Sequence, residues 1–424
     1  MSKNTKLPKL RRPFYKSNKC LICGSLKLTK YLSLGRVAPA NSYLTKAQLK
    51  KDEFKAPLEV YFCHNCHLAQ LLHIVDRRLL YDRYAYFSST SPMLVKHFEE
   101  YANKIFRKFP KQSKQLVIDI GSNDGVLLKP LKILGARVLG IDPAKNIARV
   151  ANKEGIETIA TFFNQDLVPE IIKKYGRAGI ITSNNTLAHT DIIHDIFAGV
   201  KNLLDSSGVF VFEVQYIADL LTHNEFDNTY HEHICYYSIG PLSYLLKMHG
   251  MEIFDIIHTD THGGAVMVFA THSPSFFPVS KAVKKFLDEE IRLGLHKLST
   301  YKNFAKRPPL VKNKLTKLLK NLKKEGKKIT AYGASAKATT LLQYCNIGPE
   351  IIDYITDSAP SKQGKYTPGT HIPIVAEETL RAKTPDYIII TAWNYAKNIM
   401  EKKEGWFKKQ GGKFIIPIPE PVIV

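Results

Sequence analysis

The chain has 424 residues, more than one hydrophobic core usually serves, so we expect roughly two to four domains. No stretch approaches the roughly 18 uncharged apolar residues of a membrane-spanning helix, and no apolar run follows the basic N-terminus, which favours a cytoplasmic protein without a secretory signal. The net charge of +23 suits anionic partners such as nucleic acid, a membrane surface or phosphorylated small molecules. Richness in Lys, Asn, Ile and Tyr also fits a genomic bias, so the charge alone does not favour nucleic acid.

Residues 1–75 contain two C-x-x-C pairs, Cys20 with Cys23 and Cys63 with Cys66. In a reducing cytoplasm such pairs favour metal binding over disulfides. Each pair can place two thiolates on one side of a tight turn, and two such turns complete a tetrahedral Zn²⁺ site. Four thiolates leave no open position, so the predicted zinc is structural and holds together a segment too small to fold by its apolar area.

Two alternatives stay open for this segment. Either of two neighbouring histidines, His64 or His67, can replace a cysteine as ligand, although a surface position is the simpler interpretation. A redox role for a C-x-x-C pair is the other, but neither pair lies at the strand-to-helix turn that a thioredoxin motif needs.

The central segment, residues 76–275, contains the most informative stretch, QLVIDIGSNDGVLLKPLKILG. Residues 116–120 predict a buried strand, followed by a glycine turn and an apolar helix pattern. The next predicted strand, VLGID, ends in Asp142. This is a β-α-β unit, and an acidic residue at the tip of its second strand can bind the two hydroxyls of a ribose.

The spacing of the glycines indicates the cofactor. The pattern is D-x-G-x-N-x-G and lacks the G-x-G-x-x-G that lets backbone approach a pyrophosphate. An acidic residue before the turn suits a cationic ligand with an amino group, such as S-adenosylmethionine. A nicotinamide cofactor, or a unit without a ligand, is the alternative. We expect the cofactor to be bound by Asp119, Gly121, Asn123, Asp124, Gly125, Asp142, Asn184, Asn185 and His189.

The remainder of this segment continues the alternation of strands and helices. RAGIITSNN predicts a strand whose tip carries Asn184 and Asn185, and GVFVFEV predicts another buried strand. MEIFDIIH and GAVMVFAT flank THGG, which predicts a closing hairpin. A mostly parallel sheet that ends in an antiparallel hairpin matches class I methyltransferases. His189 either faces the cofactor or caps the following helix.

Two clusters carry groups suited to acid–base chemistry. One is YDRYAYFSSTSPM, with Tyr84 and Tyr86, and the other is DNTYHEHICYYS, with Tyr230, Glu232 and His233. Carbon methylation beside a ketone needs a base for the α-proton, and a histidine titrates near neutrality. It also needs a donor to the developing enolate oxygen, which a tyrosine hydroxyl supplies. A polar-capped loop or an H-x-H metal site are the alternatives for YHEH.

The C-terminal segment, residues 276–424, begins with apolar residues at helical spacing, which predict an amphipathic linking helix over residues 311–322 with a solvated basic face. KKITAYGASAKATTLLQYC predicts a strand, a glycine turn and a helix, a second nucleotide-binding-like unit. Backbone N–H groups at such a helix start can hold a phosphate, and a lysine adds charge. The alternative is a unit kept only for packing. The candidate substrate-binding residues are Gly333, Ser335, Lys337, Asn394 and Tyr395.

The ordered motifs CxxC, CxxC, YxYxSS, DIGSNDG, GIDP, NNxLAH, YHEH, HGG, YGASAK and WNY resemble the sugar C-methyltransferases that make branched deoxysugars. The resemblance covers residues 20–420. It implies an α/β protein of three domains: a zinc-binding piece, a class I methyltransferase core with a Rossmann-like sheet, and a second Rossmann-like domain at the C-terminus. It also implies a nucleoside-diphosphate-linked 4-keto-deoxysugar, methylated at C3 through an enolate.

Residue roles follow from the same resemblance. His233 matches the base, Glu232 and Tyr230 hold or polarise the sugar, and one of Tyr84 and Tyr86 completes the pocket. The chain departs from the family after HGG, where Ala265, Val266 and Met267 replace the usual serine and later arginine. That departure leaves the identity of the sugar open.

Other function classes remain as alternatives. An O- or N-methyltransferase acting on another small molecule is one, and a zinc-containing RNA methyltransferase is a second. A non-catalytic binding protein is a third, although the intact cofactor motif argues against it. We expect a nucleotide-sugar partner, no nucleic acid and no membrane, and the choice between monomer and homodimer stays open.

Overall fold

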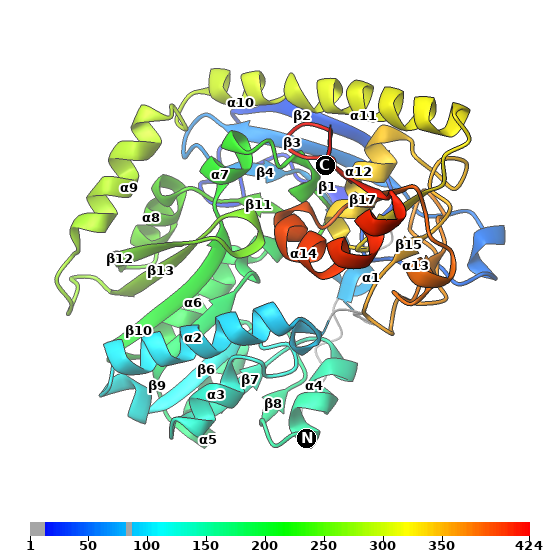
Figure 1. Cartoon of the computed structure of the whole chain (residues 1–424). Helices are drawn as coiled ribbons and strands as arrows, with labels where there is room; N and C mark the ends of the chain where they lie inside the picture. Colours follow the sequence, from blue (N-terminus) through cyan, green and yellow to red (C-terminus); the bar gives the residue numbers. More distant parts are fainter. Residues whose placement is uncertain (1–12, 82–86) are drawn as a thin grey trace.

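The computed structural model describes residues 13–81 and 87–424, which form an N-terminal, a central and a C-terminal domain (Figure 1). In Figure 1, α9 runs along the left side beside the β12–β13 hairpin, and α10 and α11 continue across the top toward the C-terminal sheet. Among the described residues, no helix is both long enough and apolar enough to cross a membrane.

The N-terminal domain is built on an antiparallel sheet with the strand order β11-β4-β3-β2. Its edge strand β11, Cys235–Tyr236, comes from the central part of the chain and pairs with β4. The domain is therefore completed by a segment more than 150 residues further along the sequence. Its own elements are β1 Phe14–Lys16, β2 Leu28–Val37, β3 Ala56–Cys63, β4 Ala69–Leu71, β5 His73–Val75 and α1 Arg77–Tyr81.

The central domain is a seven-stranded sheet with the order β12-β13-β10-β9-β6-β7-β8. The pairs β7–β8, β6–β7, β6–β9 and β9–β10 are parallel, and β13 is antiparallel to both of its neighbours. This confirms the expected sheet with a closing hairpin. The strands are β6 Leu116–Ile120, β7 Arg137–Ile141, β8 Thr158–Ile159, β9 Ala178–Asn184, β10 Leu204–Gln215, β12 Met251–Thr259 and β13 Ala265–His272.

Helices cover both faces of the central sheet, which explains why strands such as β6 are apolar along nearly their whole length. The amphipathic helix α2 packs Phe98, Tyr101 and Ile105 against one face. The helices are α2 Pro92–Lys108, α3 Leu128–Ile133, α4 Lys145–Lys153, α5 Val168–Tyr175, α6 Ile193–Leu203, α7 Ile217–Thr222 and α8 Ile239–Met248.

The C-terminal domain has a six-stranded sheet in the order β16-β15-β14-β17-β18-β19, parallel except for β19. Its strands are β14 Ile329–Tyr332, β15 Ile355–Thr356, β16 Ile374–Val375, β17 Tyr387–Ile390, β18 Lys413–Ile416 and β19 Val422–Ile423. Its helices, with those leading to it, are α9 Lys281–Arg292, α10 Leu298–Phe304, α11 Arg307–Lys324, α12 Ala336–Cys345, α13 Thr379–Ala382 and α14 Ala396–Phe407.

The predicted linking helix is α11, which buries four apolar residues of the expected periodicity, Val311, Leu315, Leu319 and Leu322. One continuous hydrophobic cluster includes residues of all three domains. The short 3-10 helices are η1 Gln48–Lys50, η2 Ser88–Thr90, η3 Gln112–Lys114, η4 Gln165–Leu167, η5 Leu187–His189, η6 Phe226–Asn228, η7 Thr261–Gly263, η8 Trp393–Tyr395 and η9 Lys408–Gln410.

Candidate active site and metal centre

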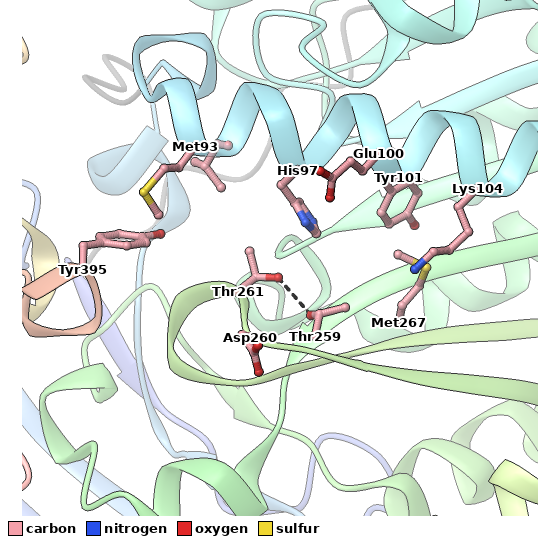
Figure 2. A pocket seen from close by; sticks show the side chains of 11 residues that line it. Met93, His97, Glu100, Tyr101, Lys104, Thr259, Asp260, Thr261, Met267 and Tyr395 are labelled. Atoms are coloured by element: carbon pink, nitrogen blue, oxygen red, sulfur yellow. Dashed lines mark hydrogen bonds between the residues drawn. The ribbon is translucent and has the colours of Figure 1, made fainter. Parts of the chain in front are cut away.

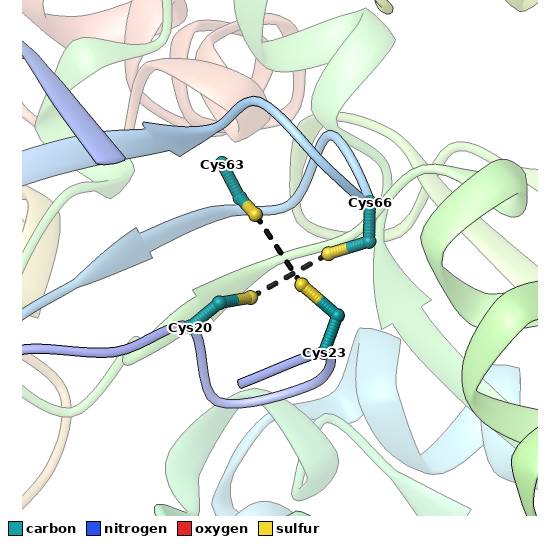
Figure 3. A group of neighbouring side chains, drawn as sticks. All are labelled: Cys20, Cys23, Cys63 and Cys66. Carbon is teal, nitrogen blue, oxygen red and sulfur yellow. Dashed lines mark hydrogen bonds between the residues drawn. The ribbon is translucent and has the colours of Figure 1, made fainter. Parts of the chain in front are cut away.

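The four paired cysteines converge on one point in the N-terminal domain (Figure 3). The Sγ atoms of Cys20 and Cys66 are 3.5 Å apart, those of Cys23 and Cys63 are also 3.5 Å apart, and all four lie within 4.8 Å of one another. A tetrahedral zinc with bonds of about 2.3 Å needs sulfur atoms about 3.8 Å apart. The set therefore fits zinc, with no position left for substrate.

The two cysteine turns have matching backbones. Gly24 and His67 each follow the second cysteine of a pair, adopt positive φ angles of 70° and 64°, and donate a backbone hydrogen bond to the first cysteine. The His64 ring hydrogen-bonds Thr29, and the His67 ring stacks on Phe62. Neither histidine joins the metal cluster, so the surface interpretation of them is the one that the structure supports.

The glycine turn after β6 adopts a backbone that few side chains allow. Gly121, Asn123 and Gly125 have φ angles of 78°, 48° and 79°, and a Cβ atom on Gly121 would collide with the side chain of Thr186. The Asp142 carboxylate at the tip of β7 accepts hydrogen bonds from the backbone N–H groups of Asn123 (2.9 Å) and Ala144 (2.8 Å). Asp142 thus fixes the turn to the next strand.

Two further aspartates of this turn are buried. Asp119 accepts a hydrogen bond from the Thr182 hydroxyl at 2.7 Å, and burial raises its pKa to about 7. Asp124 accepts hydrogen bonds from the hydroxyl and backbone N–H of Ser89, which joins the turn to the segment after residue 86. The buried carboxyl of Asp119 suits a cationic ligand, because an ammonium group would stabilise its ionised form.

The strand tips of β9 and β10 meet beside this turn. Asn185, with φ of 53°, donates to Glu213 through its backbone (2.8 Å to the carbonyl) and its side chain (3.4 Å to the carboxylate). The side-chain amide of Asn184 and the hydroxyl of Tyr101 on α2 are buried without a hydrogen-bond partner among the described residues. His189 lies elsewhere: its ring is 5.1 Å from the ring of His233 and stacks on that of Tyr81. His189 therefore joins the YHEH cluster.

The YHEH cluster defines the state of one histidine. His233 Nδ1 lies 2.9 Å from the backbone carbonyl oxygen of Asn228, and its Nε2 lies 2.7 Å from the Tyr230 hydroxyl. A carbonyl oxygen only accepts, so Nδ1 carries the proton and Nε2 accepts from Tyr230 in the neutral ring. The lone pair on Nε2 of His233 thus points toward the Tyr230 hydroxyl.

Glu232 belongs to the interior of the same cluster. Its side chain is 1% exposed, and burial raises its pKa to about 7. Oε1 accepts a hydrogen bond from Asn41 of the N-terminal domain (3.2 Å), and Oε2 has no partner among the described residues. His231 is buried with a pKa lowered to about 4, and neither it nor His233 belongs to a metal-ligand group among the described residues.

Two predicted tyrosines, Tyr84 and Tyr86, lie outside the described residues. Ser88 and Ser89, which follow them, are held by the cofactor turn, since the Ser88 backbone N–H donates to the Asn123 side chain at 2.9 Å.

The C-terminal candidates are split between two places. Gly333, with φ of 95°, and Ser335 shape the turn before α12, and the Ser335 hydroxyl caps this helix at Ala338 N. The cation at this turn is Lys362, whose ammonium donates to the Ala334 carbonyl (2.9 Å). Sequence reasoning missed Lys362, although it lies in the KQGK loop that follows the second strand.

Lys337 is the second residue of α12 and is buried. Its ammonium is 4.6 Å from the centre of the Trp393 ring and interacts with the carboxylates of Glu225 and Asp227. Burial lowers the pKa of Lys337, and the two carboxylates oppose this effect. Asn394 and Tyr395 follow Trp393 in η8.

A cleft of about 330 Å³ separates α2 from the β12–β13 hairpin, and Tyr395 reaches its edge (Figure 2). The buried carboxylate of Glu213 lies beneath it, 3.1 Å from the His97 ring, and accepts hydrogen bonds from Thr259 and Thr261. Sequence reasoning missed this group, although Glu213 is the one acidic residue of the apolar strand GVFVFEV. The cleft is lined by Met93, Leu94, His97, Glu100, Tyr101, Lys104, Thr259, Asp260, Thr261, Met267 and Tyr395.

The strand order, the single antiparallel strand β13 and the acidic glycine turn define a class I S-adenosylmethionine-dependent methyltransferase. Three family models agree: a domain described as zinc-binding matches residues 20–81, a methyltransferase domain matches 94–256, and a C-methyltransferase C-terminal domain matches 260–419. The C-methyltransferase NovU of Streptomyces niveus is 34% identical over 407 residues, which are 96% of this chain and 97% of that protein. The chain belongs to this C-methyltransferase family.

Two solved methyltransferase structures are similar to part of this chain. A magnesium protoporphyrin IX methyltransferase from Synechocystis with bound S-adenosylmethionine is 14% identical, with a TM-score of 0.33 over 43% of this chain and 82% of that one. An S-adenosylmethionine-dependent methyltransferase from Clostridium acetobutylicum is 14% identical, with a TM-score of 0.34 over 41% of this chain and 92% of that one. Because both TM-scores are low, the class rests on the sheet order and the family models. Membership of a C-methyltransferase family favours carbon over the O- and N-methyl alternatives.

Proposed function

We propose that this enzyme transfers a methyl group from S-adenosylmethionine to C3 of a nucleoside-diphosphate-linked 4-keto-deoxysugar, through an enolate. The observation that carries the proposal is the pair of contacts of the His233 ring, in which Nδ1 lies 2.9 Å from a backbone carbonyl oxygen and Nε2 lies 2.7 Å from the Tyr230 hydroxyl, so that Nε2 is the basic nitrogen. A neutral imidazole held in this way is suited to take a proton from carbon near neutral pH. The reduced thiolates of the zinc site and a free nucleotide-sugar substrate both favour a cytoplasmic location.

Each residue of the cluster has a task in this reaction. When the sugar binds, the Tyr230 hydroxyl turns from Nε2 to the ketone oxygen, and His233 Nε2 receives the C3 proton. Tyr230 then donates a hydrogen bond to the enolate oxygen, where negative charge develops. Burial raises the pKa of Glu232 to about 7, and its Oε2 can hydrogen-bond a sugar hydroxyl, as donor when protonated and as acceptor when ionised.

The bound cofactor supplies an electrophilic methyl group, and the chain supplies its orientation. Asp119 would pair with the ammonium of the methionyl end, and Asp142 would meet the ribose. The diphosphate of the substrate would meet the N-terminus of α12, with Gly333, Ser335 and the cation of Lys362. Tyr395 borders the cleft, and Asn394 precedes it in η8.

Exchange of the C3 proton tests this proposal without relying on transfer of the methyl group. The enzyme, loaded with S-adenosylhomocysteine, is mixed in D₂O with thymidine- and other nucleoside-diphosphate-linked 4-keto-6-deoxysugars, and exchange is followed by ¹H NMR. We expect the wild type to exchange C3–H, and His233→Asn to lose at least about 100-fold of the rate, as removal of a general base usually does.

Two results would contradict the proposal. Undiminished exchange and methylation by His233→Asn would remove His233 from the role of base. Binding of S-adenosylhomocysteine without binding or exchange of any keto-sugar nucleotide would discard the substrate class. His272→Asn serves as the matched control, because His272 lies at the end of β13 opposite Met251, outside the YHEH cluster and the four-cysteine group, and its loss should leave the exchange rate unchanged.

A further inference from the structure

The loop before His233 is buried and tied down from outside its own domain. Glu225, Asp227, Asn228 and Thr229 are each at most 1% exposed, although all four are polar. Buried polar residues persist where their hydrogen bonds or charges are met by other parts of the chain. The partners of this loop therefore indicate what holds it.

Three contacts come from the C-terminal domain. The Trp393 indole N–H donates to the Asp227 carboxylate at 2.7 Å, and the Thr340 hydroxyl donates to the Thr229 carbonyl at 3.2 Å. The Lys337 ammonium lies 4.6 Å from the centre of the Trp393 ring and is attracted by the charges of the Glu225 and Asp227 carboxylates. Thr340 and Lys337 lie on one helix, α12, and are three residues apart, so they face the same side.

Asn228 connects this anchored loop to the proposed base. Its side-chain amide donates to Glu225 Oε2 at 2.6 Å, and its backbone carbonyl accepts from His233 Nδ1 at 2.9 Å. The Asn228 carbonyl, which selects the His233 tautomer, is positioned by two contacts: the Asn228 side chain bonds to Glu225, and the next residue, Thr229, is bonded to Thr340. A shift of this loop would release Nδ1 and with it the orientation of the ring.

We propose that Lys337, Thr340 and Trp393 of the C-terminal domain are positioning residues, which hold the loop of residues 225–229 so that the Asn228 carbonyl orients His233 for proton removal. This inference rests on the proposed role of His233. It gives the C-terminal domain a part in the chemical step, beside the binding of the nucleotide. It also gives Lys337 a task other than the predicted contact with the diphosphate.

The two tasks of Lys337 differ in kinetics, because a phosphate contact acts mainly on KM and an orienting contact acts mainly on kcat. We expect Trp393→Phe, Thr340→Val and Lys337→Met each to lower kcat about tenfold or more, with KM for the sugar nucleotide changed by less than about threefold. Thr330→Val is the matched control, since it also deletes a buried hydroxyl bonded to a backbone carbonyl, that of Tyr354, in the same domain. Its kcat should stay at the wild-type value.

The ¹⁵N NMR signals of ring-labelled histidine in the full-length, zinc-loaded protein give a second measurement that needs no substrate. The His233 signals, identified by their loss in His233→Gln, should show an Nδ1–H tautomer in the wild type and in Thr330→Val. In Trp393→Phe and Thr340→Val, the signals should move toward an average of the two tautomers, and the pH titration midpoint should shift.

These measurements separate failure of this inference from failure of the proposed function. An unchanged tautomer in Trp393→Phe and Thr340→Val, in folded protein, would overturn the positioning role whether or not a substrate is known. A raised KM with kcat retained would assign Lys337 to the diphosphate. A changed tautomer without sugar-nucleotide turnover by the wild type would keep the positioning role and discard the substrate.

Discussion

Asp119 is a residue whose position the sequence indicates and whose environment only the structure shows. Asp119 was expected before the glycine turn, and its position at the end of β6 confirms the strand and the turn around it. Its burial, and the pKa of about 7 that follows, come from neighbouring strands. Ionisation of Asp119 therefore lowers the free energy of unfolding of the cofactor-free protein, and a cationic ligand would stabilise the ionised carboxylate.

Asp119→Asn should have opposite effects on stability and on cofactor binding. The folded pKa is raised above the ordinary value of about 3.9, so the folded chain resists ionisation and the free energy of unfolding falls as the pH rises from about 4 to about 7. An asparagine at this position does not ionise, so the variant keeps its free energy of unfolding over this range. The difference in free energy of unfolding between the variant and the wild type should therefore shift in favour of the variant by roughly 2 kcal/mol from pH 5 to pH 8. Thermal unfolding at both pH values measures the difference.

The same variant should bind S-adenosylhomocysteine at least about tenfold more weakly at pH 8, because the ammonium group loses its carboxylate. Isothermal titration measures this affinity. Asp205→Asn provides the control, since Asp205 bonds only to Ser206 and Ser207 among the described residues. Equal affinities of wild type and Asp119→Asn would remove Asp119 from the cofactor site.

At the scale of elements, the strands place the site at their carboxyl ends, and the backbone of the turns sets the geometry of the site. The turn from β6 to α3 has three positive φ angles within five residues, and its glycines were recognisable from the sequence. Their close neighbours were not, because Thr186 and Ile156 approach from other parts of the fold. The turn thus depends on the absence of side chains at Gly121 and Gly125.

Gly121→Ala should abolish cofactor binding by closing this approach. Both the positive φ and the collision with Thr186 oppose the new Cβ atom, so the turn must move. Gly135→Ala is the matched control, because Gly135 has φ of 97° but no atom within 4 Å of its added Cβ. We expect Gly135→Ala to cost about 1 kcal/mol of stability and to leave binding of S-adenosylhomocysteine intact. Loss of binding in both variants alike would show that strain, and not the collision, decides.

At the scale of the whole molecule, the zinc domain and the active site share a sheet. The edge strand β11 begins two residues after His233 and pairs with β4, and the Leu71 N–H donates to the Ile234 carbonyl at 2.8 Å. Asn41 reaches Glu232 across 191 positions of sequence. The zinc-binding domain therefore supports the segment that carries YHEH, through the β11–β4 pairing and through Asn41.

Removal of zinc should abolish methyl transfer and spare the cofactor. Elemental analysis should give one zinc per chain, and Cys63→Ser should lower the content, because it removes one of four ligands. After chelation or in this variant, we expect loss of C3 exchange with S-adenosylhomocysteine affinity within about threefold of wild type. Cys345→Ser, far from the cluster in α12, should retain both zinc and activity. Full activity of the metal-free protein would show that the active site does not depend on the zinc site.

The sequence by itself determined the elements whose evidence is local. The paired cysteines, the glycine turn with its acids, the alternation of strands and helices and the closing hairpin each occupy a short stretch, and spacing alone encodes them. The tertiary structure decided which of these meet. It placed His189 beside His233, buried Lys337 within the electrostatic reach of Glu225 and Asp227, and paired Glu213 with His97. Such pairings depend on burial and on side chains far apart in the chain, because the charge of a group is set by neighbours that no local spacing records.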